Sequence, residues 1–220
     1  MTHLEEELKS LKKSVLEMTA LAISQLKKAK DAYMNMDTEI AQVVIHNEKR
    51  MNAIELSIDR DCENIFALFN PVASDLRFVI AMLKINSDLE RIADYAEGIA
   101  SYVVDFDQDL RAELIEATKL NLMFDIAISM AQDIMVAFDE EDDKLAMKVY
   151  KKDVELNMIN KNSSSVICDF AKKDPDIIVQ SLFLFSTIRK LERVGDHIKN
   201  IAEELIFYLE AEILKHKKNG

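Results

Sequence analysis

Acidic side chains recur at helical spacing in a six-residue motif that is written twice in the chain. Residues 89–94, Leu-Glu-Arg-Ile-Ala-Asp, match residues 191–196, Leu-Glu-Arg-Val-Gly-Asp, at an offset of 102. If the motif is helical, its two acids lie one turn apart on one face, where like charges cost about a few tenths of a kcal/mol. Keeping such a pair in both copies indicates a cation close by, and the neighbouring Arg91 and Arg193 are the simplest candidates.

Further oxygen-bearing side chains precede each copy of the motif, at positions that fit the flank of another helix. In the first half they are Glu48, Asn52, Glu55 and Asp59. Their counterparts in the second half are Asp153, Asn157 and Asn160. If the two helices of each half are neighbours, these groups face the motif and form a cluster of hard oxygen donors, which suits Mg²⁺, Mn²⁺ or iron better than Zn²⁺ or Cu²⁺. The first half has more carboxylates and is expected to bind more tightly. The candidate metal ligands are Glu48, Glu55, Glu90, Asp94, Asp153, Glu192, Asp196 and Glu203.

These two rows of acidic and amide side chains, the acidic stripes, also fit a solvent-exposed helix face with surface ion pairs, each of which contributes little to stability. His197 falls on the other flank of its helix and is expected to be a surface residue rather than a ligand. Cys62 and Cys168 have no neighbouring Cys or His pair, so we expect buried reduced thiols rather than a zinc or redox site.

Long amphipathic helices must position these acids, because the chain lacks the residues that other folds need for their turns. Its 220 residues include 3 Gly and 2 Pro, and 49% are hydrophobic and 31% charged. That composition excludes P-loop, Rossmann and β-sandwich folds, which depend on glycine-rich loops or many tight turns. Apolar residues alternating at spacings of four and three over residues 4–36 predict a first helix, with Thr2 and Glu5 as a capping box.

The boundaries of the next helices are marked by capping residues and by proline. A second helix is expected to begin at Asp37 or Thr38 and to run to the Asn70-Pro71 break. Asn70 is expected to cap a third helix whose first position is Pro71, since proline is favoured there. Asp174-Pro175 restarts a helix in the same way in the second half.

This three-helix pattern occurs twice. A shift of 105 residues places nine residues between positions 18 and 52 on identical residues, from Met18 on Met123 to Asn52 on Asn157. Each half is then three helices of about 30 residues joined by short turns. We expect an all-α fold of two tandem, pseudo-symmetric three-helix bundles, residues 1–106 and 107–220. The polar stretch at 105–109 is too short for a flexible linker, so the halves should be docked.

The net charge of the chain and the lengths of its apolar runs limit which ligands it can bind and in which compartment it is expected. The net charge of −12 repels phosphate backbones, which argues against nucleic acid as a ligand. The first residues are acidic where a signal peptide is basic, and the longest apolar run, residues 78–83, is too short to cross a bilayer. We therefore expect a cytoplasmic protein. No nucleophile with a paired base and no phosphate loop can be assembled, so no catalytic residues are assigned and no enzyme is expected.

The two motifs resemble those of the PhoU family of phosphate-response regulators. Residues 70–77, Asn-Pro-Val-Ala-Ser-Asp-Leu-Arg, and residues 195–204, which contain Gly-Asp-His and Asn-Ile-Ala-Glu-Glu, resemble further family signatures. The resemblance covers essentially the whole chain. It implies that Glu90, Asp94, Glu192 and Asp196 are metal ligands, assisted by Glu48 and Asp153.

The resemblance also implies a role and partners. Family members bind multinuclear iron, or Mg and Mn, on the bundle surfaces. They are cytoplasmic, are often homodimers, and act as negative regulators of phosphate uptake and phosphate-starvation signalling. In that role they couple the ATPase subunit of a phosphate ABC transporter to a sensor histidine kinase, and they reach the membrane only through these partners.

Two other functions fit the residues. One is a carboxylate-bridged iron-storage or oxidase bundle, although ferritin-like sites use Glu-x-x-His and no Glu here has His three residues later. The other is a helical scaffold that binds no metal.

Overall fold

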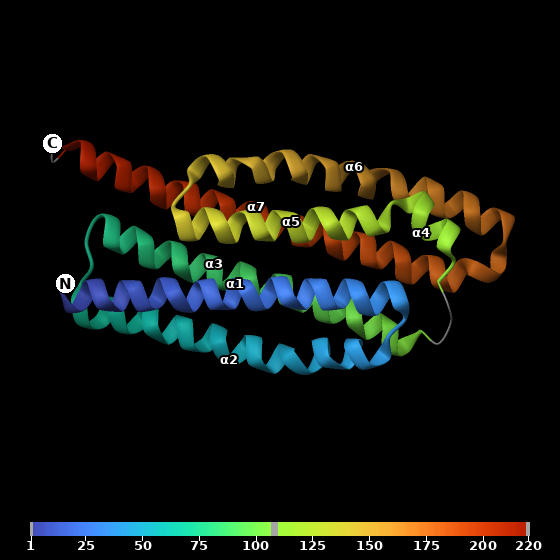
Figure 1. The fold of residues 1–220 in the computed structure, drawn as a ribbon, viewed down its shortest axis with the longest axis horizontal. Helices are drawn as coiled ribbons and strands as arrows, with labels where there is room; N and C mark the ends of the chain where they lie inside the picture. Colours follow the sequence, from blue (N-terminus) through green and yellow to red (C-terminus); the bar gives the residue numbers. More distant parts are fainter. Residues whose placement is uncertain (1, 107–109, 219–220) are drawn as a thin grey trace.

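The computed structural model describes residues 2–106 and 110–218, with side chains to residue 210, and every regular element in these ranges is a helix (Figure 1). The first bundle contains α1 (His3–Asn35), α2 (Thr38–Phe69) and α3 (Ser74–Asp105). The second contains α4 (Ala112–Thr118), α5 (Leu120–Glu140), α6 (Asp143–Lys173), the short 3₁₀ helix η1 (Pro175–Ile177) and α7 (Ile178–Lys218). The predicted all-α fold with two tandem helical bundles is confirmed. The expected boundary at 106/107 borders residues 107–109, which lie outside the described residues.

Side-chain caps start the helices where the sequence predicts. The Thr2 hydroxyl accepts from the Glu5 amide at 3.2 Å, and the Glu5 carboxylate accepts from the Thr2 amide at 2.8 Å. Asp37 Oδ1 accepts from the Ile40 amide at 2.9 Å and so caps α2. Its repeat counterpart Asp142 caps α6 in the same way, with a 3.0 Å bond from the Leu145 amide. The repeat therefore extends to local capping chemistry.

The second helix ends at the Asn70-Pro71 break as predicted, but the roles predicted for Asn70 and Pro71 at the start of the third helix were wrong. Asn70 does not cap α3 but ends α2, in the left-handed conformation with φ 45° and ψ 58°. Asparagine tolerates this conformation better than most residues, and proline commonly follows a helix end because it cannot continue the helix. After Ala73, which also has a positive φ of 49°, α3 begins at Ser74. In the second half, Pro175 opens η1 rather than α7.

The first long helix expected in the second half is broken in two. Lys119 adopts a left-handed conformation with φ 57° and separates α4 from α5. Before the break, the Thr118 hydroxyl donates to the Leu114 carbonyl at 2.8 Å, as β-hydroxyl side chains can in a helix. No glycine or proline marks this position in the sequence.

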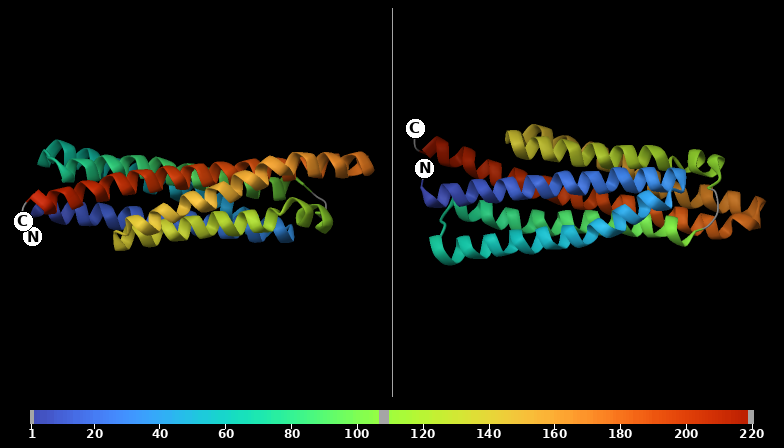
Figure 2. Two further views of the ribbon diagram at one scale, coloured as in Figure 1. Left: turned by 90° about the horizontal axis from the view of Figure 1, so that it is seen from above. Right: turned by 60° about the horizontal axis from the view of Figure 1, so that its bottom comes forward.

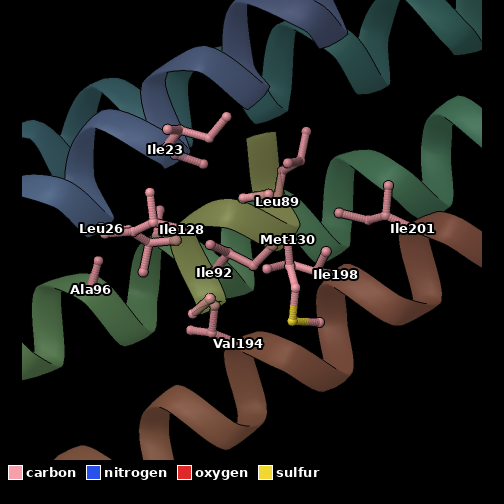
Figure 3. Packing of buried hydrophobic residues seen from close by; sticks show 14 of the residues in the cluster. Ile23, Leu26, Leu89, Ile92, Ala96, Ile128, Met130, Val194, Ile198 and Ile201 are labelled. Carbon is pink, nitrogen blue, oxygen red and sulfur yellow. The ribbon is translucent and has the colours of Figure 1, made fainter. Parts of the chain in front are cut away.

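The two bundles lie side by side along their length and share one apolar core. Helix α3 packs against α7 and α1 against α5, while α2 and α6 lie on the outside (Figures 1 and 2). Figure 3 shows where side chains from the four inner helices meet, with Leu26 of α1, Ile92 of α3, Met130 of α5 and Val194 of α7 among them. The docking predicted from the short connection is thus confirmed.

Helix α5 is, by length and composition, the one described helix that could cross a membrane. It packs against α1, α6 and α7 and just over half of it is buried, as in a core helix. Cys62 is buried as expected, but Cys168 is exposed; both thiols are free.

Candidate functional site

The first cluster lies between the outer helix α2 and the central helix α3; it comprises Glu55 and Asp59 of α2 and Asn86, Glu90 and Asp94 of α3. Asn86 is fully buried and joins the two helices. Its Nδ2 donates to the Glu55 carbonyl at 3.0 Å and to Asp59 Oδ1 at 2.9 Å. The Glu55 carboxylate also interacts electrostatically with Asp94 and Glu90, so acids of α2 and α3 face each other in the first cluster.

Like charges crowd each other in the first cluster. Burial raises the pKa of Glu90, and the charges of Asp94 and Glu55 raise it further against the opposing effect of Arg91. Burial also raises the pKa of Glu55, with Asp59 and Asp94 adding to the effect. A cation placed among these carboxylates would relieve the repulsion.

Arginine is the cation that both motifs hold in the structure. Arg91 Nη1 lies 3.1 Å from Asp94 Oδ2, and Arg91 Nε lies 3.6 Å from Glu90 Oε2. The corresponding distances from Arg193 to Asp196 and Glu192 are 3.1 and 3.5 Å. The Arg91 side chain is 57% exposed, so its ion pairs contribute little and are easily broken.

The second cluster lies between α6 and α7; it comprises Asp153 and Asn157 of α6 and Glu192, Asp196 and Lys199 of α7. Asp153 Oδ2 accepts from Asn157 Nδ2 at 3.1 Å and from Lys199 Nζ at 3.3 Å. Lys199 Nζ also donates to Asp196 Oδ1 at 3.2 Å. Burial works against the charge of Lys199, but its bonds with Asp196 and Asp153 outweigh this and raise the pKa of the ammonium group.

Gly195 allows α7 to approach α6 at this cluster. A Cβ at Gly195 would lie 2.6 Å from Leu156 Cδ1 and 3.4 Å from Asp153 Oδ1. The close approach brings the buried Asp153 beside the second copy of the motif. In the first copy the corresponding residue, Ala93, is buried with its methyl group in place.

Several predicted ligands lie apart from these contacts. Glu48 accepts a hydrogen bond from Asn52, which repeats the pairing of Asp153 with Asn157. Among the described residues, no hydrogen bond or ion pair joins Glu48 to α3. Glu203 is exposed and lies beside Tyr150, whose pKa burial and the Glu203 charge raise. Across the part of the chain with described side chains, no three Asp, Glu, His or Cys side chains converge as they do around a metal ion.

Sequence reasoning missed two members of the clusters. Asn86 lies four residues before Glu90, so the i, i+4 spacing of the motif continued backwards would have included it. Lys199 lies three residues after Asp196 and so shares its face of α7, but the arginine inside each motif was the simpler candidate for the cation.

Four buried oxygens of the two stripes accept no hydrogen bond. They are Oδ1 of Asn52, Oδ1 of Asn86, Oδ1 of Asp153 and Oε2 of Glu192. Glu192 Oε2 has the Arg193 guanidinium 3.5 Å away. Buried polar atoms are nearly always paired with protein, water or an ion, so the other three oxygens mark where a further donor or a cation fits.

The expected surface position of His197 was wrong. Its Nδ1 lies 2.7 Å from Asp88 Oδ1 of the other bundle, and its ring lies 5.7 Å from that of Tyr95. The flank of α7 opposite the acids packs against α3 rather than facing solvent, which the angle around one helix cannot show.

Comparison with known proteins covers both bundles. The family model described as the PhoU domain matches residues 15–103 and again residues 120–205. The chain belongs to the PhoU family. The phosphate-specific transport system accessory protein PhoU homolog of a Burkholderia species is 32% identical over 211 residues, which is 96% of this chain and 90% of that protein.

Solved PhoU structures share the fold. PhoU from Pseudomonas aeruginosa superimposes with a TM-score of 0.88 at 29% identity and covers 94% of this chain and 99% of its own. The phosphate transport system regulatory protein PhoU from Streptococcus pneumoniae gives a TM-score of 0.85 at 32% identity, covering 94% of this chain and 97% of its own. The expected PhoU relationship is therefore confirmed over both bundles.

The two clusters differ in how well they fit the metal that the family resemblance implies. The first cluster offers carboxylate and amide oxygens, an unpaired buried oxygen on Asn86, and only an exposed guanidinium as its present cation. These features fit a hard divalent or trivalent cation. In the second cluster, Arg193 and Lys199 already pair with the three carboxylates. Because two cations occupy these carboxylates, the second cluster fits a metal ion less well than the first.

Proposed function

We propose that this chain is a non-enzymatic, cytoplasmic negative regulator of phosphate uptake and phosphate-starvation signalling. The observation that carries the proposal is the match of both bundles, at 96% coverage of the chain, to accessory proteins of phosphate transport. In this role the chain couples the ATPase subunit of a phosphate ABC transporter to a sensor histidine kinase. It acts as a homodimer and meets the membrane only through these partners.

The side chains favour action by binding rather than by catalysis. Burial raises the pKa of the Cys62 thiol to about 12, so it stays protonated and is a poor nucleophile at neutral pH. The acid-rich surfaces of α2, α3 and α7 are better suited to holding cations or basic partner segments.

We further propose that the first cluster binds Mg²⁺, Mn²⁺ or iron. Glu55, Glu90 and Asp94 would supply carboxylate oxygens, and Asn86, whose Oδ1 is buried without a partner, bonds to Glu55 and Asp59 of the same cluster. Binding requires Arg91 to turn away from Asp94, which costs little because exposed ion pairs are worth about 0–1 kcal/mol. A bound cation would neutralise the cluster and hold α2 to α3.

Gene deletion and complementation test the regulatory role. Deleting the gene should raise expression of a phosphate-starvation reporter in phosphate-rich medium, and the wild-type gene should restore repression. Unchanged reporter expression in both rich and poor phosphate would refute the proposal. A tagged chain should also capture the transporter ATPase or the kinase from phosphate-replete cells.

Elemental analysis tests the metal proposal. Protein purified without chelator should contain metal that is lost in the Glu90→Gln/Asp94→Asn variant. The Glu113→Gln/Glu116→Gln variant removes the same number of carboxylates from the exposed face of α4 and should keep the metal. Equal metal content in all three proteins would refute the ligand assignment and favour the metal-free scaffold. Catalytic oxygen consumption on adding Fe(II) would favour the oxidase alternative.

A further inference from the structure

The two repeats carry opposite charges at one matching position of their third helices. Lys199 of α7 corresponds, at the offset of 102, to Glu97 of α3. In the second bundle the Lys199 ammonium lies between Asp153 Oδ2 at 3.3 Å and Asp196 Oδ1 at 3.2 Å, and so links α6 to α7. In the sequence, the counterparts of these two acids, Glu48 and Asp94, are also acids, so the first repeat has three acids at the positions where the second has two acids and a lysine.

We propose that Lys199 is an internal counter-ion that takes the place of a metal ion in the second cluster, so that metal binding by this chain is confined to the first bundle. The part that concerns the first bundle rests on the metal function proposed above. The part that concerns Lys199 stands on the geometry of the second cluster alone.

Burial makes the lysine hard to displace. The Asp153 side chain is 8% exposed and that of Lys199 is 27% exposed, whereas Arg91 at the first cluster is 57% exposed. Removing a cation from a buried carboxylate leaves an uncompensated charge, which is much more costly than breaking an exposed ion pair. A metal entering the second cluster would have to displace Lys199, while one entering the first displaces only Arg91.

The lysine satisfies only part of the second cluster. Asp153 Oδ1 remains buried without a partner although Oδ2 of Asp153 has two donors, and Glu192 Oε2 accepts no hydrogen bond and has only the Arg193 guanidinium 3.5 Å away. Asp153 Oδ1 lies on the side of Gly195, where a Cβ would be 3.4 Å from it. These oxygens are the donors that a metal would use once the ammonium is gone, so replacing Lys199 should expose a latent cation site.

Counting Mn²⁺ sites tests the proposal. The full chain is treated with chelator and titrated with Mn²⁺, and free Mn²⁺ is measured by electron paramagnetic resonance. Lys199→Glu, which restores the residue type of the first repeat, should bind one Mn²⁺ more per chain than the wild type. Lys151→Glu makes the same charge change at an exposed position of α6 and should add none. Glu97→Lys should weaken binding at the first cluster.

The outcomes separate this inference from the proposed function. If the wild type binds Mn²⁺ and Lys199→Glu binds no more than it does, the inference is overturned and the metal function stands. If the wild type binds none but Lys199→Glu binds one, the metal function fails and the role of Lys199 stands. If the wild type loses bound Mn²⁺ in the Asp153→Asn/Asp196→Asn variant, the second cluster is itself a metal site and the inference is overturned. This last measurement does not depend on whether Lys199→Glu folds.

The effect of Mn²⁺ on the melting temperature distinguishes a counter-ion from a lysine that only stabilises the fold. Without metal, Lys199→Gln and Lys199→Glu should both melt below the wild type, because Asp153 loses its cation. Added Mn²⁺ should raise the melting temperature of Lys199→Glu more than that of the wild type, since ligand binding to the folded state stabilises it. Equal Mn²⁺-induced shifts in the two proteins would contradict the counter-ion role.

Discussion

Nδ1 of His197 lies 2.7 Å from Oδ1 of Asp88 and so joins α7 to α3 across the contact between the two bundles. Asn200 donates to the same oxygen at 3.3 Å. Both members of the main pair are largely buried, with side-chain exposures of 21% and 16%. The core that the two bundles share is apolar and its contacts are non-directional, so this polar pair helps to fix how the two bundles align.

Removing the Asp88 carboxylate should destabilise the docked bundles. Asp88→Ala leaves both His197 and Asn200 without their acceptor, and a lost hydrogen bond to a charged, part-buried group costs about 1.5–3 kcal/mol. Urea unfolding measures the change in the free energy of unfolding. Glu17→Ala serves as the control because Glu17 pairs with Lys13 at 3.6 Å on a fully solvated face of α1. That variant should change the same quantity by less than about 0.5 kcal/mol, and equal losses would contradict the role of Asp88.

The two helical glycines should respond oppositely to alanine. Gly195→Ala places a methyl group 2.6 Å from the buried Leu156 and should destabilise the fold by about 1–3 kcal/mol. Gly98→Ala meets only the end of the flexible Lys190 side chain, at 2.7 Å, and should gain up to about 1 kcal/mol from helix propensity. Melting temperatures of the two variants check this contrast, and a stabilising Gly195→Ala would show that α6 and α7 can separate without cost.

Stability should fall with rising pH through the carboxylates of the first cluster. The pKa of Glu90 is raised above its ordinary 4.5, so between that value and its folded-state pKa the folded protein holds a proton that the unfolded chain has lost. The resulting stability is complete below pH 4.5 and is lost as the pH rises through the folded-state pKa.

Glu90→Gln in chelator-treated protein tests this pH dependence. The variant should be more stable than the wild type at pH 7, and the difference should shrink as the pH falls toward 4.5, where Glu90 becomes neutral as well. Urea unfolding over this pH range measures the difference. The control, Glu113→Gln, removes one carboxylate from the exposed face of α4. A Glu90→Gln difference that is constant with pH would contradict the prediction.

The two cysteines should differ in reactivity. Cys168 is exposed, whereas Cys62 is buried and its thiol pKa is raised to about 12. At pH 8 a thiol reagent should therefore modify only Cys168 in the native protein and both residues in denaturant. Mass spectrometry of the labelled protein identifies the modified residue. Rapid labelling of Cys62 under native conditions would show that the first bundle opens readily.

Local sequence signals predicted most of the helices because each depends on residues close together in the chain. Asp37 and Asp142 cap helices through amides three residues away, and the apolar spacing of α1 is a property of that helix alone. The failures lie where several local conformations compete. Asn70 can cap the start of a helix or adopt a left-handed conformation at the end of one, and the structure selects the second. Lys119 has no intrinsic reason to adopt a positive φ, so only packing of α4 against α6 and α5 can account for the break.

The candidate site was predictable only as far as one helix face specifies it. The motif spacing placed Glu90 and Asp94 on one side of α3, and the duplicated pattern placed acids of α2 opposite them. The bond from Asn86 to the Glu55 carbonyl and the link between His197 and Asp88 depend on how separate helices pack. A helix-by-helix projection contains no information about its neighbours, so these contacts could not be derived from it.

The tight fit of Gly195 against Leu156 also limits how the two repeats can diverge or exchange parts. At the same positions the first repeat has Ala93 and Met51, so grafting its third helix into the second bundle would bring in a methyl group that Leu156 leaves no space for. A viable exchange would have to carry both positions together. Although the two halves repeat one sequence pattern, their third helices are therefore not interchangeable.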